Sequence, residues 1–331
     1  MKDSPFISII IPTKNEEAVI GKCLTEVLNL KTPKDEYEVI VVDSYSSDRT
    51  VEIAKTFKID VLQVGTRNAT VSASRNLGAK RAKGAVLAFL DADCIVSEDW
   101  LNNALQHFRN SEASLVGYKY RIPENSSRAA RAWDLIFSDR ERRGKNEWIP
   151  AGNMFVSRDC FESVGGFDEN LVTSEDVDLC QRLRERGFRI VTDPKIIVTH
   201  SGTPQTHSQL YRKEVWHGIG ALQTFLSDLT RVRNLRPVLY AVFFAFCLVG
   251  VLISLGFTIL TRNAVALSLL TFFLILLLTV PVALTLPVMK RANKHSLLAS
   301  ISMVYLTYGI ARAICLLRFL RKKVYDAQKN I

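Results

Sequence analysis

Two clusters of acidic residues have the types and spacing that could do chemistry. The first is Asp91-Ala92-Asp93, which directly follows the apolar run 85–90. Two carboxylates where a buried strand leaves its sheet offer hard oxygen ligands, which suit Mg²⁺ or Mn²⁺ bridging a diphosphate. The alternative is that one aspartate merely caps a helix beginning near Ser97. This motif alone leaves both explanations open.

The second cluster comprises Glu175, Asp176 and Asp178, which open a helical pattern behind Thr173 or Ser174 as the expected cap. Acidic residues in a first turn stabilise the helix dipole by a few tenths to about 1 kcal/mol, which is the ordinary explanation. Three acids in four positions exceed that need. Because crowding raises carboxylate pKa values, one of them is suited to general-base catalysis.

Two further polar residues end strand-like runs. Asp43 closes YEVIVVD, where a carboxylate can accept a hydrogen bond from a nucleotide base or ribose. Taken alone, it would be assigned to a capping turn. His200 closes KIIVTH, and a lone histidine in such a place is more often structural than a ligand.

Two glycine-containing segments are candidates for contacts with an acceptor or a sugar. Gly152 and Asn153 lie in WIPAGNM, where a sugar ring could approach the backbone closely. Gly166, Phe167 and Asp168 belong to a turn just before the acidic helix, in which glycine supplies unusual backbone angles. A plain loop is the alternative for both segments.

The elements that must position these residues are strands alternating with amphipathic stretches. Strands joined by crossover helices form a parallel sheet covered on both faces, and such sheets bind ligands beyond the carboxyl ends of their strands. The sequence therefore predicts an α/β domain over residues 1–204 with its site at one edge of the sheet. The expected strands are residues 7–12, 37–43, 59–64 and 85–91.

The charge of the 331-residue chain is divided unevenly. Residues 1–204 hold 28 Lys/Arg against 30 Asp/Glu, whereas residues 205–331 hold 15 against 3. The basic part also contains residues 238–260 and 264–289, two uncharged runs long enough to cross a bilayer as a helical hairpin. Its cations are therefore expected to face anionic lipid, and nucleic-acid binding is not expected.

Two flanking segments leave alternatives open. Residues 205–236 fit an amphipathic interfacial helix or a helix packed on the soluble domain, and residues 237–331 form the membrane domain. Residues 296–317 are a third transmembrane helix or an interfacial helix, because Arg312 lies inside the run. A third span would also export the basic residues that follow it, against the positive-inside rule.

Five segments taken together closely resemble the family 2 glycosyltransferases of the GT-A fold. The resemblance spans residues 6 to about 200 and implies a Rossmann-like, mostly parallel sheet, a nucleotide-sugar donor and a Mn²⁺ or Mg²⁺ ion. The segments are SIIIPTKNE (8–16), VVDSYSSDRT (41–50), ASRNLGAKRAKGAVLAFLDAD (73–93), GGFDE (165–169) and EDVDLCQRLRERGF (175–188).

Carried over residue by residue, the resemblance implies a donor site at the strand ends. Pro12, Thr13 and Glu16 would line the nucleotide pocket. Asp43 would contact the base, and Arg75 would lie near the diphosphate.

The same resemblance implies the catalytic roles. Asp91 would reach the ribose or a metal-bound water, Asp93 would coordinate the ion, and His200 is a further candidate ligand. Asp176, paired with Glu175, would deprotonate the acceptor hydroxyl in a single displacement with inversion.

These observations predict a membrane-anchored inverting glycosyltransferase in the cell membrane, with its catalytic domain in the cytoplasm. Its acceptor would be a lipid-linked saccharide or another membrane-proximal molecule. The polyprenyl-phosphate sugar synthases and a non-catalytic nucleotide-sugar scaffold are the alternatives. A processive synthase is disfavoured, because Gln181-Arg182-Leu183-Arg184 ends in Glu185 rather than in a QxxRW-type motif.

Overall fold

The strand β1 (Ile7–Thr13) lies at the centre of the sheet, and all seven of its residues are buried. A continuous apolar run is what a strand covered on both faces requires. It pairs in parallel with β2 (Tyr37–Asp43) on one side and with β4 (Val86–Leu90) on the other, and β3 (Asp60–Gln63) extends the sheet beyond β2. The predicted parallel strands are confirmed.

The other half of the sheet is mixed, and the sequence indicated only the strand-like segment WIPAGNM (148–154) near it. β7 (Asn153–Ser157) runs antiparallel to both β4 and β6 (Leu115–Gly117), and β8 (Ile190–Thr192) lies parallel to β6, which gives the order β3-β2-β1-β4-β7-β6-β8. A small second sheet pairs β5 (Cys94–Val96) with β9 (Val198–His200). Because Cys94 and His200 are direct partners in it, this ribbon carries His200 to the residues that follow β4.

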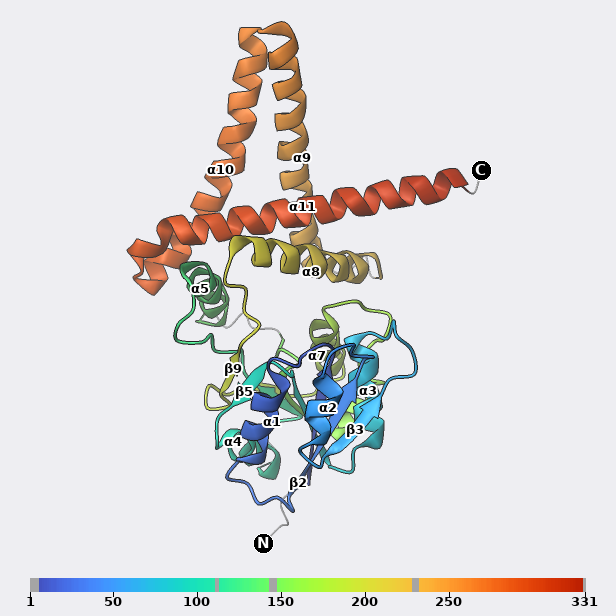
Figure 1. Cartoon of the computed structure of the whole chain (residues 1–331). Helices are drawn as coiled ribbons and strands as arrows, with labels where there is room; N and C mark the ends of the chain where they lie inside the picture. The colour runs from blue at the N-terminus through green and yellow to red at the C-terminus, as the bar shows by residue number, and fades with distance from the viewer. Residues whose placement is uncertain (1–5, 111–112, 143–147, 228–231, 330–331) are drawn as a thin grey trace. The chain divides into compact units, whose positions relative to one another are not determined.

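Helices cover both faces of the large sheet (Figure 1). Alternate residues of β1 point to opposite faces, so Ile9 packs with Leu24 and Trp100, whereas Ile10 packs with Phe161 and Leu179. The helices whose side chains join the first cluster are α1 (Ile20–Leu28), α2 (Thr50–Lys55) and α4 (Trp100–Arg109). Those that join the second are α3 (Val71–Arg81), α6 (Arg158–Ser163) and α7 (Glu175–Glu185).

The computed structural model describes residues 6–110, 113–142, 148–227 and 232–329. The chain divides into a catalytic unit, residues 1–124 with 146–203, and a helical unit, residues 125–145 with 204–331. Residues 125–145 differ from the prediction, which had included them in the domain 1–204. Their helix α5 (Arg128–Arg142) belongs to the helical unit because its Ala132 and Ile136 join an apolar cluster there.

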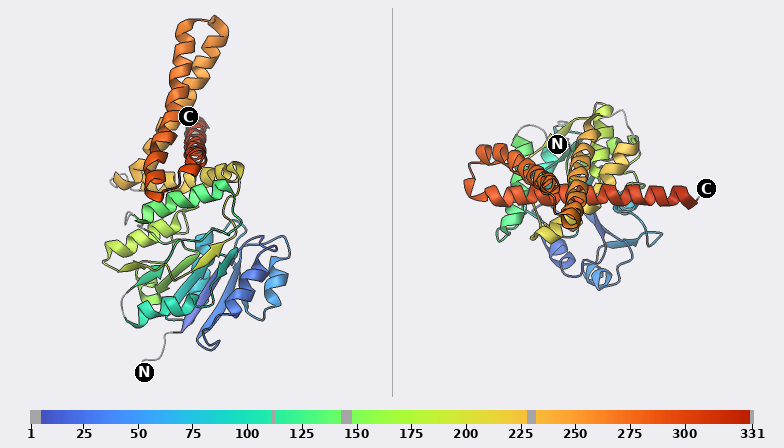
Figure 2. Two further views of the ribbon diagram at one scale, coloured as in Figure 1. Left: turned by 90° about the vertical axis from the view of Figure 1, so that its left-hand side faces the viewer. Right: turned by 90° about the horizontal axis from the view of Figure 1, so that it is seen from above.

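The helical unit is built on a hairpin of α9 (Val232–Thr261) and α10 (Ala264–Ala292). The helix α8 (His207–Ser227) precedes the hairpin, and a 3₁₀ turn, η1 (His295–Leu297), leads to α11 (Leu298–Lys329). Residues 232–236, predicted as the end of the amphipathic helix, instead begin α9. Figures 1 and 2 show α11 lying across the base of the hairpin rather than alongside it.

Candidate active site

The ends of β1 and β2 form one wall of the candidate site. Thr13 and Asp43 are direct partners in this parallel pair. Hydrogen bonds join the loops that follow, since the backbone N–H of Asn15 donates to Ser46 Oγ at 2.8 Å and that of Glu16 donates to Thr50 Oγ1 at 2.7 Å. The two loops therefore form one continuous edge.

The residues predicted to bind the nucleotide lie at this edge and differ in burial and hydrogen bonding. Pro12 is buried, and the Thr13 Oγ1 atom is buried without a hydrogen-bond partner in the part of the chain that the structure describes, which leaves it available to a ligand. Asp43 is 1% exposed and accepts hydrogen bonds from the Ser46 N–H, as the capping alternative expects. Burial and the charges of the nearby Asp93 and Asp91 raise the pKa of Glu16 to about 7.

Arg75 is the centre of the site and is almost fully buried. Its two terminal nitrogens donate to different carboxylates, Nη2 to Asp91 Oδ1 at 2.7 Å and Nη1 to Glu175 Oε1 at 2.6 Å. It thereby ties α3 to the end of β4 and to the start of α7. Arg75 Nε is buried without a hydrogen-bond partner among the described residues, so the predicted contact of Arg75 with the diphosphate stays a prediction.

Asp91 is held from its other side by Tyr120, whose hydroxyl donates to Asp91 Oδ2 at 2.9 Å. The same hydroxyl accepts the Gly152 N–H at 3.0 Å. Burial alone would raise the pKa of Asp91, but the charges of Arg75 and His200 and the Tyr120 hydrogen bond together lower it below its ordinary value. A side chain at Gly152 would overlap the Asp91 carboxylate and the Tyr120 hydroxyl, so this backbone can lie here only as glycine.

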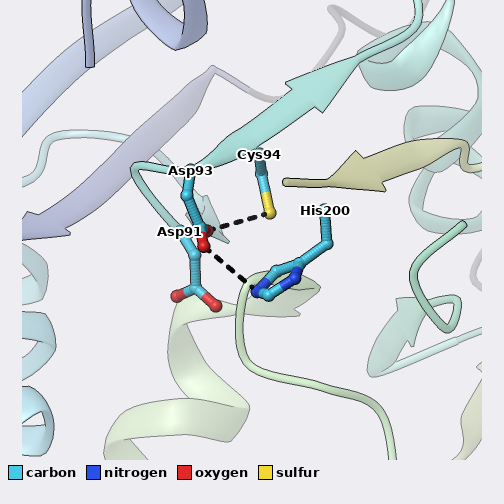
Figure 3. A group of neighbouring side chains, drawn as sticks. All are labelled: Asp91, Asp93, Cys94 and His200. Carbon is cyan, nitrogen blue, oxygen red and sulfur yellow. Dashed lines mark hydrogen bonds and ion pairs between the residues drawn. The ribbon is translucent and has the colours of Figure 1, made fainter. Parts of the chain in front are cut away.

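A group of metal-ligating side chains lies where β4 meets the small sheet (Figure 3). Asp91, Asp93, Cys94 and His200 each offer a ligand atom within 4.8 Å of the others. Asp93 faces two of them, with Oδ2 at 3.4 Å from His200 Nε2 and Oδ1 at 3.8 Å from Cys94 Sγ. Carboxylate oxygen and imidazole nitrogen are donors that Mn²⁺ accepts. The donor set therefore fits a divalent cation.

The three carboxylates in the first turn of α7 accept hydrogen bonds from different donors. Glu175 accepts from Arg75, and Asp178 accepts from Arg182 at 2.6 and 2.8 Å. Asp176 accepts only its neighbour's N–H, that of Val177, among the hydrogen bonds of the described residues. Burial, followed by the adjacent charge of Glu175, raises the pKa of Asp176 to about 7.

The start of α7 also stores backbone strain. Ser174 occupies the N-cap position with φ of +70°, and its side chain makes no capping hydrogen bond. A left-handed serine costs of order 1 kcal/mol or more, and such strain is often found at functional sites. The capping role expected of this position is therefore wrong for the Ser174 side chain, although the helix does begin there.

Comparison with known proteins identifies the chain. The model described as "Glycosyl transferase family 2" matches residues 8–162, and that described as "Glycosyl transferase family group 2" matches residues 86–286. The chain belongs to glycosyltransferase family 2. The glycosyltransferase AglE of Haloferax volcanii is 32% identical over 239 residues, which cover 70% of this chain and 77% of that protein.

Two other proteins extend the comparison of this family 2 glycosyltransferase. The Methanococcus voltae dolichyl N-acetyl-alpha-D-glucosaminyl phosphate 3-beta-D-2,3-diacetamido-2,3-dideoxy-beta-D-glucuronosyltransferase is 29% identical, over 59% of this chain and 66% of that one. The solved mannosyltransferase PcManGT from Pyrobaculum calidifontis, in complex with GDP-Man and Mn²⁺, has a TM-score of 0.58. It covers 95% of this chain and 88% of its own at 18% identity, which supports the shared fold.

Not all residues predicted for this glycosyltransferase site point into it. Asn153 is fully buried, and its side-chain amide is satisfied there: it accepts from Trp100 and donates to the carbonyls of Tyr118 and Ile196. Phe167 is 2% exposed in the core, where its ring packs beneath the Arg75 guanidinium. In this structure both side chains lie in the core next to the site, and a role for either in sugar binding stays a prediction.

The remaining residues of that turn are also structural in part. Gly166 takes a φ of +71°, the left-handed region in which glycine is favoured. Asp168 accepts from the N–H of Asn170 and so closes its own turn. The turn docks on α3, where the Asn76 side-chain amide donates to the Phe167 carbonyl at 2.8 Å. Its role in acceptor binding stays a prediction.

Two residues of this glycosyltransferase site were not predicted from the sequence. Tyr120 joins Asp91 to the Gly152 backbone, yet it lies in no motif that single-sequence reasoning would mark. Cys94 directly follows the acidic motif and faces Asp93, so its position in the chain was a usable signal. Burial and the charges of Asp91 and Asp93 raise the pKa of the Cys94 thiol well above its ordinary value, so without a metal it is protonated.

Proposed function

We propose that this protein is a membrane-anchored, metal-dependent, inverting glycosyltransferase that moves one sugar from a nucleotide donor to a lipid-linked acceptor. The observation that carries the proposal is the state of Asp176, a half-buried carboxylate beside Arg75 and Asp91 with a pKa raised to about 7. A general base works best when its pKa is close to the operating pH.

Asp176 would take the proton of the acceptor hydroxyl as that oxygen attacks the anomeric carbon. The other two acids of this turn are less suited to the role, because Glu175 and Asp178 each form an ion pair with an arginine. Asp176 has no such ion pair among the described residues. Arg75 holds Glu175 beside it, and burial, followed by the charge of Glu175, raises the pKa of Asp176. Attack from the face opposite the departing nucleotide inverts the anomeric centre.

Asp93, Asp91 and His200 would hold the divalent cation, whose positive charge offsets that of the departing nucleoside diphosphate. Asp91 already accepts from Arg75 and Tyr120, but each carboxylate oxygen has two lone pairs and can also ligate a metal. The orphan Thr13 Oγ1 and the ends of β1 and β2 would receive the nucleoside. The Mn²⁺ and GDP-Man in the structurally similar mannosyltransferase support this assignment.

The acceptor proposal rests on the helical unit and on the relatives. The hairpin of α9 and α10 is apolar and outwardly exposed, as a membrane anchor requires, and the M. voltae relative is named for a dolichyl phosphate-linked acceptor. Anchoring raises the effective concentration of a lipid-borne hydroxyl at the site. We place the catalytic unit on the cytoplasmic side, because the last turn of α10 carries Lys290 and Arg291 and the segment after it carries Lys294.

The test is single-sugar transfer by purified protein in lipid nanodiscs, comparing Asp176→Asn with Glu185→Gln, an exposed change on the same helix. General-base catalysis contributes about 10²- to 10⁴-fold, so D176N should lose that factor while E185Q is unchanged. Donor binding, read as a rise in melting temperature with nucleoside diphosphate and Mn²⁺, should survive in D176N and disappear in Asp93→Ala. Normal turnover by D176N would refute the base.

The same experiment separates the alternative acceptor. A polyprenyl-phosphate sugar synthase transfers to a phosphate oxygen, which is already ionised at neutral pH and needs no base. If the protein glycosylates a polyprenyl phosphate and D176N does so equally well, the synthase function replaces the one proposed here.

A further inference from the structure

The last helix, α11, has the length and composition of a membrane span. Its segment His295–Arg321 has a mean hydropathy of 1.5, against 2.7 for Pro237–Thr261 and 2.6 for Ala264–Ala292. By that measure the chain would cross a bilayer three times. How α11 packs within the helical unit argues otherwise.

The helix α11 exposes far fewer large apolar side chains than the two helices of the hairpin. Of the large apolar side chains that are exposed in the described residues, ten lie on α9, ten on α10 and three on α11. Twenty outward-facing apolar side chains need lipid around them on all sides. Among the described side chains of α11, the exposed large apolar ones are Leu298, Met303 and Leu320, near the two ends of its apolar segment.

Protein covers α11 along most of its length. Ala313 and Leu316 pack against Leu222 of α8 and Phe244 of α9 in one cluster. Ile301 and Val304 join α5, α8 and Val288 of α10 in a second cluster. The helix therefore lies between the base of the hairpin on one side and α5 and α8 on the other, which is the crosswise position seen in Figures 1 and 2.

A buried ion pair fixes this position. Arg312 Nη2 of α11 donates to Glu214 Oε2 of α8 at 2.7 Å, and Glu214 is 1% exposed. His217 lies 2.9 Å from the other Glu214 oxygen, and the Tyr308 ring packs 4.8 Å from the Arg312 guanidinium. To cross the bilayer, α11 would have to carry Arg312 into hydrocarbon without Glu214, or take α8 with it.

We propose that α11 does not cross the membrane but lies along its surface, between the hairpin and the platform formed by α5 and α8. The chain then crosses the bilayer twice, and its C-terminus returns to the side that holds the catalytic unit. This arrangement also keeps Arg318, Arg321, Lys322 and Lys323 on the same side as Lys290, Arg291 and Lys294, as the positive-inside rule favours. Arg318 and Arg321, whose side chains are exposed, would face the phosphates of anionic lipids.

The first test maps sides with single cysteines in sealed membrane vesicles of known orientation. The reporters are Lys80→Cys on the catalytic unit, Arg262→Cys between α9 and α10, and Lys329→Cys or Ile331→Cys at the C-terminus. Cys160 is replaced by serine in all of them, since the other five native cysteines are buried. A membrane-impermeant maleimide should label K329C from the same side as K80C and from the side opposite to R262C.

The second test measures depth along α11. Fluorescent labels at Met303→Cys and Arg321→Cys, both exposed positions, are quenched with lipids brominated at defined depths. A surface helix places both labels at one shallow depth, whereas a span separates 18 residues by roughly 27 Å across the bilayer. Both tests need only the folded, membrane-bound protein, so their outcome is independent of the proposed reaction.

Each remaining outcome has a defined meaning. Labelling of K329C together with R262C, or two different depths for the labels at 303 and 321, overturns the proposal and makes α11 a third span. Labelling in denaturant with detergent checks that every cysteine is present and reactive.

Discussion

The catalytic and helical units each contain a buried arginine, and the two are arranged differently. Arg75 of the catalytic unit donates to two carboxylates, Asp91 and Glu175. Asp93 lies near Asp91, and Asp176 follows Glu175 and senses the charge of Arg75. Arg312 of the helical unit has one carboxylate partner among the described residues, Glu214, which His217 also contacts. The first cluster therefore carries excess negative charge, whereas the second is close to balanced.

The difference in charge matches a difference in role. Burial and the charge of Glu175 keep the pKa of Asp176 raised. The excess negative charge of this cluster attracts a cation, at the cost of stability, because buried like charges repel. A balanced pair in the helical unit supplies no reactive group. It resembles the buried ion pairs that specify how two elements pack. The following changes test whether the two arginines really differ in this way.

The largest effect is expected for Arg75→Met. It leaves Asp91 and Glu175 buried without their cation, and breaking a buried pair typically costs about 3–5 kcal/mol. Thermal unfolding of the detergent-solubilised protein should shift down by roughly 10 °C, and transfer should be lost. Lys80→Met, an exposed lysine on the same helix, is the control. A stable, active R75M protein would mean that Arg75 is not the centre of the site.

A comparable loss of stability, without loss of chemistry, is expected for Glu214→Ala. The change strands Arg312, whereas the double replacement Glu214→Leu with Arg312→Met removes both charges, and such swaps are often neutral. Melting temperature in nanodiscs should therefore fall by several degrees in E214A and recover in the double variant, which should also retain transfer. If the double variant is stable but inactive, the pair has a functional role and the comparison fails.

The sequence predicted the parallel half of the sheet because its strands are continuous apolar runs. It also placed the polar residues correctly at the carboxyl ends, since parallel topology fixes where those ends meet. It indicated a strand ending at His200 but neither β5 nor its pairing with β9, because a three-residue strand carries almost no periodic signal. That ribbon is what brings Cys94 and His200 to one point, so the sequence left the role of His200 open.

The direction of individual side chains could not be predicted from the sequence either. Asn153 and Phe167 lie close to the site in the sequence, but both side chains point into the core. For α11, hydropathy reports only the composition of the segment. It does not reveal the tertiary ion pair between Arg312 and Glu214, on which the proposed orientation of the helix depends. The membership of α5 in the helical unit depends likewise on tertiary contacts that no periodicity reveals.

The pH dependence of transfer sharpens the contrast at Asp176. With its pKa raised to about 7, the protonated acid below that pH cannot accept the acceptor's proton. At saturating donor and Mn²⁺, kcat should rise about tenfold per pH unit up to about 7 and then level off. An acid whose pKa is raised by folding holds its proton more tightly when folded, so its contribution to stability declines between about pH 4 and 7. A flat rate profile below pH 7 would remove Asp176 from the reaction.

The smallest effect is expected at Tyr120, which supports Asp91 from the side opposite to Arg75. Tyr120→Phe keeps the ring that packs 4.6 Å from His200 but removes the hydroxyl that bonds Asp91 and the Gly152 N–H. One hydrogen bond to a charged group contributes about 1.5–3 kcal/mol, and part is regained because Arg75 still holds Asp91. Binding of Mn²⁺ with nucleoside diphosphate, measured by calorimetry, should weaken by roughly tenfold. Tyr120→Leu also removes the ring contact and should weaken binding further. Equal losses of affinity in the two variants would mean that only the hydroxyl matters and that the His200 ring needs no support from Tyr120.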